Sequence, residues 1–137
     1  MPPQSYGPLK HVARCSPQDG RVASYFEGTV ILTGRVERAD AHTYGRIQVF
    51  IPDAKSKRLL PEPRHGGELW FANRQKAWNA FRAPPLDSRN YCWTAPAKVE
   101  VSGLAADLGD HEGSHDWVVL RNVFEVGKFA NYGCDID

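Results

Sequence analysis

The chain has few of the features that mark membrane proteins, exported proteins or strong nucleic-acid binders. It contains no apolar stretch near the ~18 residues that a membrane-spanning helix requires. Its first residues lack the basic start and the apolar run of a secretory signal. Its net charge is only +1, without the basic excess that nucleic-acid-binding proteins usually carry. We therefore expect synthesis in the cytoplasm, no membrane partner, and at most a local basic groove for nucleic acid.

Cysteine is scarce and unpatterned. Cys15, Cys92 and Cys134 are widely spaced, and none belongs to a C-x-x-C pair. This spacing predicts neither a disulfide framework nor a structural zinc site. We expect buried free thiols, with a bridge between neighbouring copies through Cys134 as the alternative.

Motifs of catalysis are also missing. The chain has no G-x-S-x-G elbow, no phosphate-binding glycine loop and no dinucleotide-binding fingerprint. One string stands out, because His111 to His115 match H-E-x-x-H, which holds zinc when it lies on a helix. Gly109 and Gly113 disfavour a helix here, so the sequence predicts a solvated loop. We expect no enzyme activity, no metal and no cofactor.

Two β-prone segments, residues 27–36 and 44–53, carry the clearest pattern in the chain. In each segment apolar residues alternate with other residues, so they fall on one face of an extended strand. These residues are Val30, Leu32 and Val36 in the first segment and Ile47, Val49 and Ile51 in the second. Gly34 fits a bend or bulge, and Pro52 fits the end of pairing. The pattern predicts the opening meander of a small β-barrel.

The phrase GTV…ADAHTYGRIQVFIPDA, within residues 26–54, resembles the oligonucleotide/oligosaccharide-binding (OB) barrel of contractile-tail hub and spike proteins of bacteriophages and type VI secretion systems. In those proteins a G-x-V strand leads through an acidic turn into G-R-[IV]-x-V-x-[IV]-P. This chain departs from the pattern in the turn, which has no Asp-Pro at residues 39–42, and no β-helical spike follows the barrel. The resemblance implies a small hub or adaptor subunit rather than a membrane-piercing needle.

Later segments fit the same architecture. Residues 68–82 place Trp70, Ala77, Trp78 and Phe81 near one side of a helix, which the prolines after residue 83 would end. A helix between the third and fourth strands is the usual OB arrangement. Residues 98–103 and 116–126 are β-prone and predict a hairpin.

The two ends of the chain predict extended arms. Residues 1–24 are rich in proline and have little apolar periodicity, and residues 127–137 follow the last predicted strand. We therefore expect a mainly β fold: a small OB-like antiparallel β-barrel over residues 25–126, with one helix and two extended terminal arms.

The function expected from these observations is structural. The resemblance implies a non-enzymatic component of a bacteriophage virion, a tail baseplate, hub or adaptor subunit located in the virion. Its partners would be other tail proteins and further copies of itself in a symmetric assembly. The arms would lock neighbouring subunits by burying Tyr6, Phe129 and Tyr132.

The alternative is a single-stranded-DNA-binding module. The runs TVILTGRVERA and KVEVSG…VVLRNVFEV are similar to barrel strands of the bacterial single-stranded-DNA-binding protein family. Such barrels stack bases on aromatic side chains set among basic ones. In this alternative Arg35, Arg46, Phe50 and Trp70 would contact nucleic acid. The competing expectation for the aromatic residues is that most of them fill the core.

Overall fold

The computed structural model describes residues 5–6, 9–15, 23–41, 45–60, 67–83, 92–107 and 115–131 of the chain. The strands are β1 (Ser5–Tyr6), β2 (Leu9–Cys15), β3 (Ala23–Ala41), β4 (Gly45–Pro52), β5 (Leu69–Phe71), β6 (Cys92–Asp107), β7 (Asp116–Val126) and β8 (Ala130–Asn131). The helices are α1 (Ala54–Lys57) and α2 (Arg74–Ala80). The chain is thus mainly β, as the sequence predicts.

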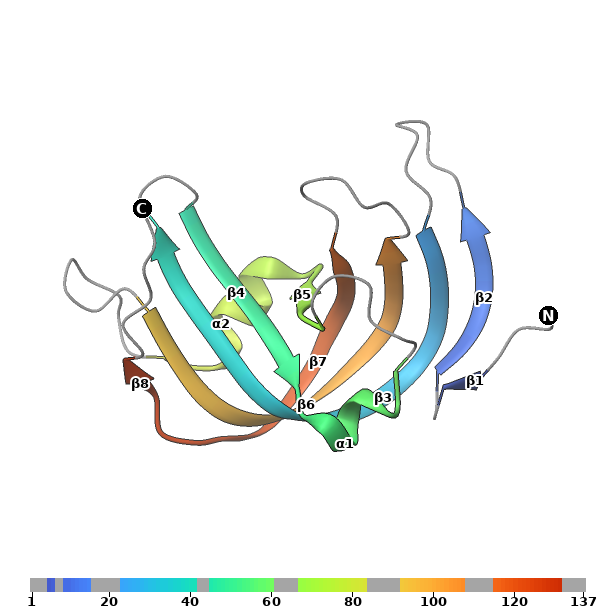
Figure 1. The fold of residues 1–137 in the computed structure, drawn as a ribbon. Helices are drawn as coiled ribbons and strands as arrows, with labels where there is room; N and C mark the ends of the chain where they lie inside the picture. The colour runs from blue at the N-terminus through green and yellow to red at the C-terminus, as the bar shows by residue number, and fades with distance from the viewer. Residues whose placement is uncertain are drawn as a thin grey trace.

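The strands close into a small OB-like barrel. The ring runs from β3 through β4, β5, β7 and β6 and returns to β3. The pairing of β5 with β7 is parallel, and the other pairings in the ring are antiparallel. Figure 1 shows the long, curved β3 and β6 side by side, with α2 near β4 and β5. The predicted meander of β3 with β4 and the hairpin of β6 with β7 are confirmed.

Glycine shapes β3 at two points. Gly28 has a φ of 119°, and it lies in the register shift of β3 against β6 between Phe26 and Thr29. At Gly34 an added Cβ would lie 2.1 Å from the carbonyl oxygen of Ile51 on β4. Gly34 therefore permits close approach of two strands, and the predicted bulge lies at Gly28 instead.

The core corrects one prediction about β4. Val30, Leu32 and Val36 of β3 are all buried, as expected from their alternation. On β4, however, Phe50 belongs to the core at 0% exposure, while Val49 is buried outside the core cluster. The corrected prediction is that of Phe50 as a ring exposed to nucleic acid: residues on both faces of the centre of β4 are apolar and buried.

The N-terminal segment extends the sheet. β2 pairs antiparallel with the first part of β3, and β1 pairs with β2. Leu9 is only 1% exposed and belongs to the core cluster. This part of the predicted arm is therefore built into the chain's own barrel, because Leu9 buries its side chain there.

The C-terminal segment also returns to the barrel within the described residues. β8 pairs with Trp93 and Thr94 of β6. Phe129 is partly buried and packs against the core cluster. Residues 132–137, and with them Tyr132, lie outside the described residues.

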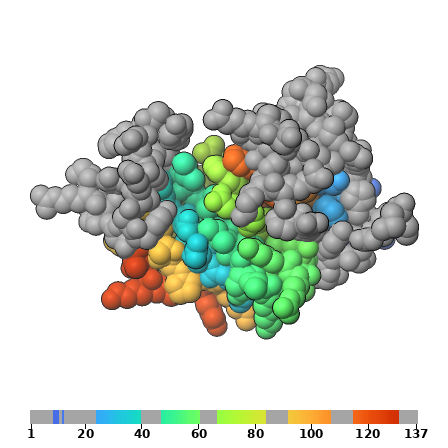
Figure 2. Space-filling model, in the orientation of Figure 1, coloured from blue at the N-terminus to red at the C-terminus, as the bar shows by residue number. Residues whose placement is uncertain are grey.

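The region of residues 68–82 contains a strand as well as a helix. Leu69 and Phe71 are buried in the core and Trp70 is half-buried, which is the two-residue period of a strand. The helix α2 is correspondingly shorter than predicted. A second helix, α1, begins after Asp53, whose side chain accepts a hydrogen bond from the Ser56 N–H. Figure 2 shows the residues of α1, in green, on the surface of the molecule. The fold therefore has two helices within the described residues, where one was expected.

Cys92 also differs from expectation. It is 1% exposed and disulfide-bonded, so the prediction of a free thiol is wrong for this residue. The partner cysteine lies outside the residues whose side chains the structure describes. Spacing along a sequence does not show which cysteines meet in space, which is why the pattern missed the bond.

Candidate functional site

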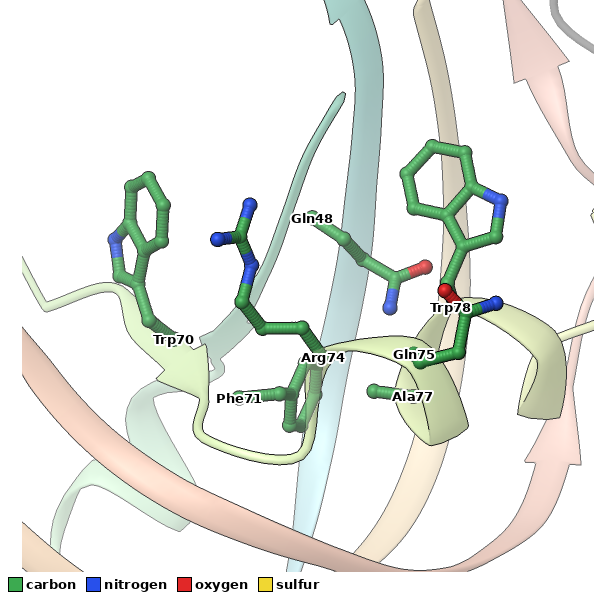
Figure 3. Close-up of a pocket in the computed structure, with 7 residues that line it drawn as sticks. All are labelled: Gln48, Trp70, Phe71, Arg74, Gln75, Ala77 and Trp78. Atoms are coloured by element: carbon green, nitrogen blue, oxygen red, sulfur yellow. The ribbon is translucent and has the colours of Figure 1, made fainter. Parts of the chain in front are cut away.

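A cavity of about 290 Å³ lies between β4 and α2, and we call it the β4–α2 cavity. It is lined by Gln48, Trp70, Phe71, Arg74, Gln75, Ala77 and Trp78 (Figure 3). This volume is at the low end of the range for small-molecule sites.

The short length of β5 opens this space. β5 pairs with β4 only through Val49 and Phe50, so Gln48 lies beyond the paired stretch. The chain then turns into α2, whose beginning is tied to β7 by hydrogen bonds between Asn73 and Leu120. Ala77 is buried in the core and fixes the inner side of α2. The cavity is thus bounded by elements whose positions depend on core packing.

A buried polar cluster forms behind the cavity. Arg38 on β3 is 4% exposed and lies opposite Gln48 on β4. Its Nε and Nη2 donate to Gln48 Oε1 at 2.9 and 2.5 Å, and Nη2 also donates to the Trp78 carbonyl. The Arg38 Cζ lies 3.9 Å from the ring centroid of Trp78, a cation–π contact. Arg38 therefore joins β3, β4 and α2.

This cluster fixes the direction of the Gln48 amide. Arg38 has only donors, so the atom that faces it must be the Gln48 oxygen. The Gln48 side chain is 9% exposed, and its Nε2 has no hydrogen-bond partner among the described residues. Figure 3 shows the amide between Arg74 and Trp78. The cavity lining thus includes a buried N–H₂ donor without an acceptor.

Two indole rings line the cavity together with this amide. Figure 3 places Trp70 beyond Arg74 on one side and Trp78 on the other. Trp70 stacks on His115 with ring centroids 4.0 Å apart and an interplanar angle of 20°. The ring centroid of Trp117 lies 5.8 Å from that of Trp70. The buried Nε1 of Trp70 has no partner among the described residues. Trp70 is therefore held by other rings, with an unused donor.

The charge at the cavity is positive. Arg74 on α2 is exposed, and its guanidinium makes no hydrogen bond or ion pair within the part of the chain that the structure describes. Among the described residues that line the cavity there is no carboxylate. Acceptor atoms and negative charge are therefore favoured there.

Two carboxylates with shifted pKa values do not line this cavity. The pKa of Asp53 is lowered, first by the hydrogen bond from Thr33 and then by that from the Ser56 N–H. The pKa of Glu68 is raised, first by burial and then by the nearby charge of Glu37. These groups therefore bear on the stability of the fold.

Three residues of the nucleic-acid alternative, Phe50, Arg35 and Trp70, have side chains that the structure describes. Phe50 is completely buried in the core, so no base can stack on it. Arg35 is exposed and pairs with Glu37 at 3.0 Å. The side chain of Arg46 lies outside the described side chains, as does that of Tyr6 from the predicted assembly interface. Trp70 lines the β4–α2 cavity.

The predicted solvated loop falls mostly on residues 108–114, which are outside the described residues. Of its two histidines, His115 is described and stacks on Trp70. The residues that the structure describes contain no group of three or more possible metal ligands. None of their helices is long and apolar enough to cross a membrane.

Sequence reasoning missed Arg38, Gln48 and Arg74 as site residues. A signal for the first two exists, because Arg38 follows Val36 by two positions and Gln48 precedes Phe50 by two. Both therefore fall on the core face of their strands, where a polar residue is unusual. Identifying Gln48 from the sequence requires knowing that the face of β4 that carries Phe50 points to the core.

The described lining side chains offer hydrogen-bond donors, the positive charge of Arg74 and aromatic rings. Such groups can hold a planar ligand that carries acceptor atoms. Comparison of the chain with models of protein families, with curated proteins and with solved structures gives no match.

Proposed function

We propose that the chain is a non-enzymatic binding module that holds a small planar group in the β4–α2 cavity. The observation that carries this proposal is the Gln48 amide, which lines the same cavity as two indole rings and is buried with its Nε2 unpartnered among the described residues. An unsatisfied buried polar group costs about 1–3 kcal/mol. A ligand acceptor at this position would remove that cost.

The surroundings of the amide support the proposal. Trp70 is stacked on His115, and Trp78 is covered by Arg38, so both rings are fixed before any ligand arrives. Fixed rings lose little side-chain entropy on binding, which favours affinity. The lining therefore resembles a preorganised site more than a packing defect.

The proposal is tested by NMR titration of the full chain with a panel of one- and two-ring aromatic compounds, some neutral and some charged. We expect saturable shifts of the Trp70 and Trp78 indole N–H signals and of the Gln48 side-chain amide. The indole N–H of Trp93 on β6 serves as the internal reference, because Trp93 does not line the cavity. If no compound in the panel moves the cavity signals, the proposal is wrong.

A second candidate is the role of a structural subunit in a contractile-tail or related assembly. It is supported by the OB-like barrel and by exposed apolar side chains on its strands, of which Ile31 is 46% and Phe124 is 49% exposed. Such side chains are suited to burial against a protein partner. Its test is mass spectrometry of purified particles, in which the chain should be present at fixed stoichiometry. Its absence from the particles would contradict this candidate.

A further inference from the structure

We infer that the β4–α2 cavity binds a planar ring that bears a carboxylate, with the carboxylate held by Arg74 and the Gln48 amide. This inference rests on the proposed function and names the ligand class for the same site.

The polarity of the ligand follows from Gln48. Arg38 donates to Oε1 at 2.9 Å through Nε, so the Gln48 amide cannot turn around without placing two donors against each other. Only the N–H₂ group remains for a ligand. The ligand atom that faces Gln48 must therefore be an acceptor.

The charge of the ligand follows from Arg74. Arg74 is exposed, and within the described part of the chain it has no acidic partner and shares the cavity lining with no carboxylate. A guanidinium binds a carboxylate through two parallel hydrogen bonds, which are stronger than bonds to a neutral acceptor. Arg74 and Gln48 line the same cavity (Figure 3), so one bound ligand can be offered both donors. A negatively charged acceptor is favoured over a carbonyl.

The shape of the ligand follows from the two indoles and the volume. Trp70 and Trp78 stand on opposite sides of Arg74 and Gln48 in Figure 3. Rings gain from stacked or edge contacts with indoles, whereas a saturated ring of equal size gains less. About 290 Å³ suits one or two rings rather than a chain of several units.

The experiment compares three probes on the full chain, by NMR and tryptophan fluorescence. Benzoate has the ring and the charge, benzamide has the ring without the charge, and cyclohexanecarboxylate has the charge without the planar ring. We expect benzoate to bind about tenfold more tightly than either of the others. Its affinity should also fall with added salt, since the carboxylate pairs with the exposed Arg74.

Variants locate the effect. Arg74→Gln should weaken benzoate binding about tenfold, because a charge-assisted pair is lost. Lys76→Gln is the matched control: Lys76 is exposed on the same helix but does not line the cavity, so benzoate affinity should stay within about twofold. Gln48→Glu keeps an acceptor for Arg38 and replaces the donor by a negative charge. It should abolish benzoate binding.

The outcomes separate the inference from the proposed function. If benzamide binds as tightly as benzoate and Arg74→Gln has no effect, the carboxylate assignment is wrong while a binding cavity stands. If cyclohexanecarboxylate binds as tightly as benzoate, the assignment of a planar ring is wrong. If none of the probes, nor any compound of the wider aromatic panel, moves the cavity signals, the proposed function fails as well.

Discussion

The side-chain amide of Asn73 holds both backbone polar groups of Leu120. Asn73 Nδ2 donates to the Leu120 carbonyl and the Leu120 N–H donates to Asn73 Oδ1, each at 2.9 Å. Just before, the N–H of Ala72 donates to the Val118 carbonyl at 2.8 Å. β5 pairs with β7 through backbone hydrogen bonds. Beyond β5, the side chain of Asn73 supplies the hydrogen bonds to β7, at the point where α2 begins.

Replacing Asn73 should destabilise the fold. Asn73→Ala leaves the two Leu120 groups without partners, and we expect the free energy of unfolding to fall by about 1–3 kcal/mol. Urea denaturation measures this change. Asn79→Ala is the control, because Asn79 is exposed on α2 and should change stability by less than about 0.5 kcal/mol. Equal effects of the two variants would contradict the role given to Asn73.

Leu9 tests whether the N-terminal segment belongs to the core. Leu9→Ala should lower the free energy of unfolding by about 2–5 kcal/mol, because it creates a cavity in the core cluster. Val12 lies on the same strand but is 47% exposed, so Val12→Ala should cost under about 1 kcal/mol. If Leu9→Ala left the free energy of unfolding unchanged, the segment would be a dispensable arm.

Asp53 should make stability depend on acid. Its carboxylate accepts hydrogen bonds from the Thr33 hydroxyl at 2.6 Å and from the Ser56 N–H at 2.9 Å. These bonds lower its pKa from the ordinary 3.8, so the charged form stabilises the native state. This contribution is present above pH 3.8 and is lost as the pH falls through the lower pKa of the folded state.

The measurement is the pH dependence of unfolding for the native chain and Asp53→Ala. At neutral pH the variant should be less stable by about 1 kcal/mol, the usual cost of losing a helix cap. The difference should shrink in acid. A difference that grows as the pH falls would contradict this account.

Glu68 should act in the opposite direction. Burial and the charge of Glu37 raise its pKa above the ordinary 4.5. The resulting penalty is absent below pH 4.5 and develops as the pH rises through the higher pKa of the folded state. Glu68→Gln should therefore raise the melting temperature at neutral pH, with a gain of about 0.5 kcal/mol. Glu125→Gln, at an exposed residue of β7, is the control and should give no such gain.

The disulfide of Cys92 should be needed for full stability. Reduction should lower the free energy of unfolding by about 2–4 kcal/mol, since the bond restricts the unfolded chain. Peptide mapping without reductant should recover Cys92 in a cross-linked peptide and identify its partner. In Cys92→Ser the reductant should have no further effect on stability. If the reductant does not change the free energy of unfolding of the native chain, this prediction is wrong.

The sequence predicted the parts of the fold that have a long repeating pattern. β3 alternates over many residues, so Val30, Leu32 and Val36 were placed correctly on one buried face. β5 has only three residues, too few for a two-residue period to stand out from a helical one. The residues of β5 are therefore included in the helix predicted over residues 68–82.

The candidate site was less predictable because it depends on two strands having the correct faces inward. Arg38 and Gln48 meet only through the register of β3 and β4, in which they are paired. A single sequence shows each as an ordinary polar residue. The aromatic ring of Trp70 makes it a candidate from sequence, but its stacking on His115 joins parts of the chain that no local pattern connects.

The long pairing of β3 with β6 has a consequence during translation. β3 is synthesised early, whereas β6, its partner from Ala23 to Ala39, is synthesised late in the chain. At about 5–20 residues per second, β3 waits several seconds with one edge unpaired. An open strand edge is a template for other chains. The nascent protein is therefore most vulnerable to aggregation in the interval before β6 leaves the ribosome, and the finished barrel no longer carries that risk along this edge of β3.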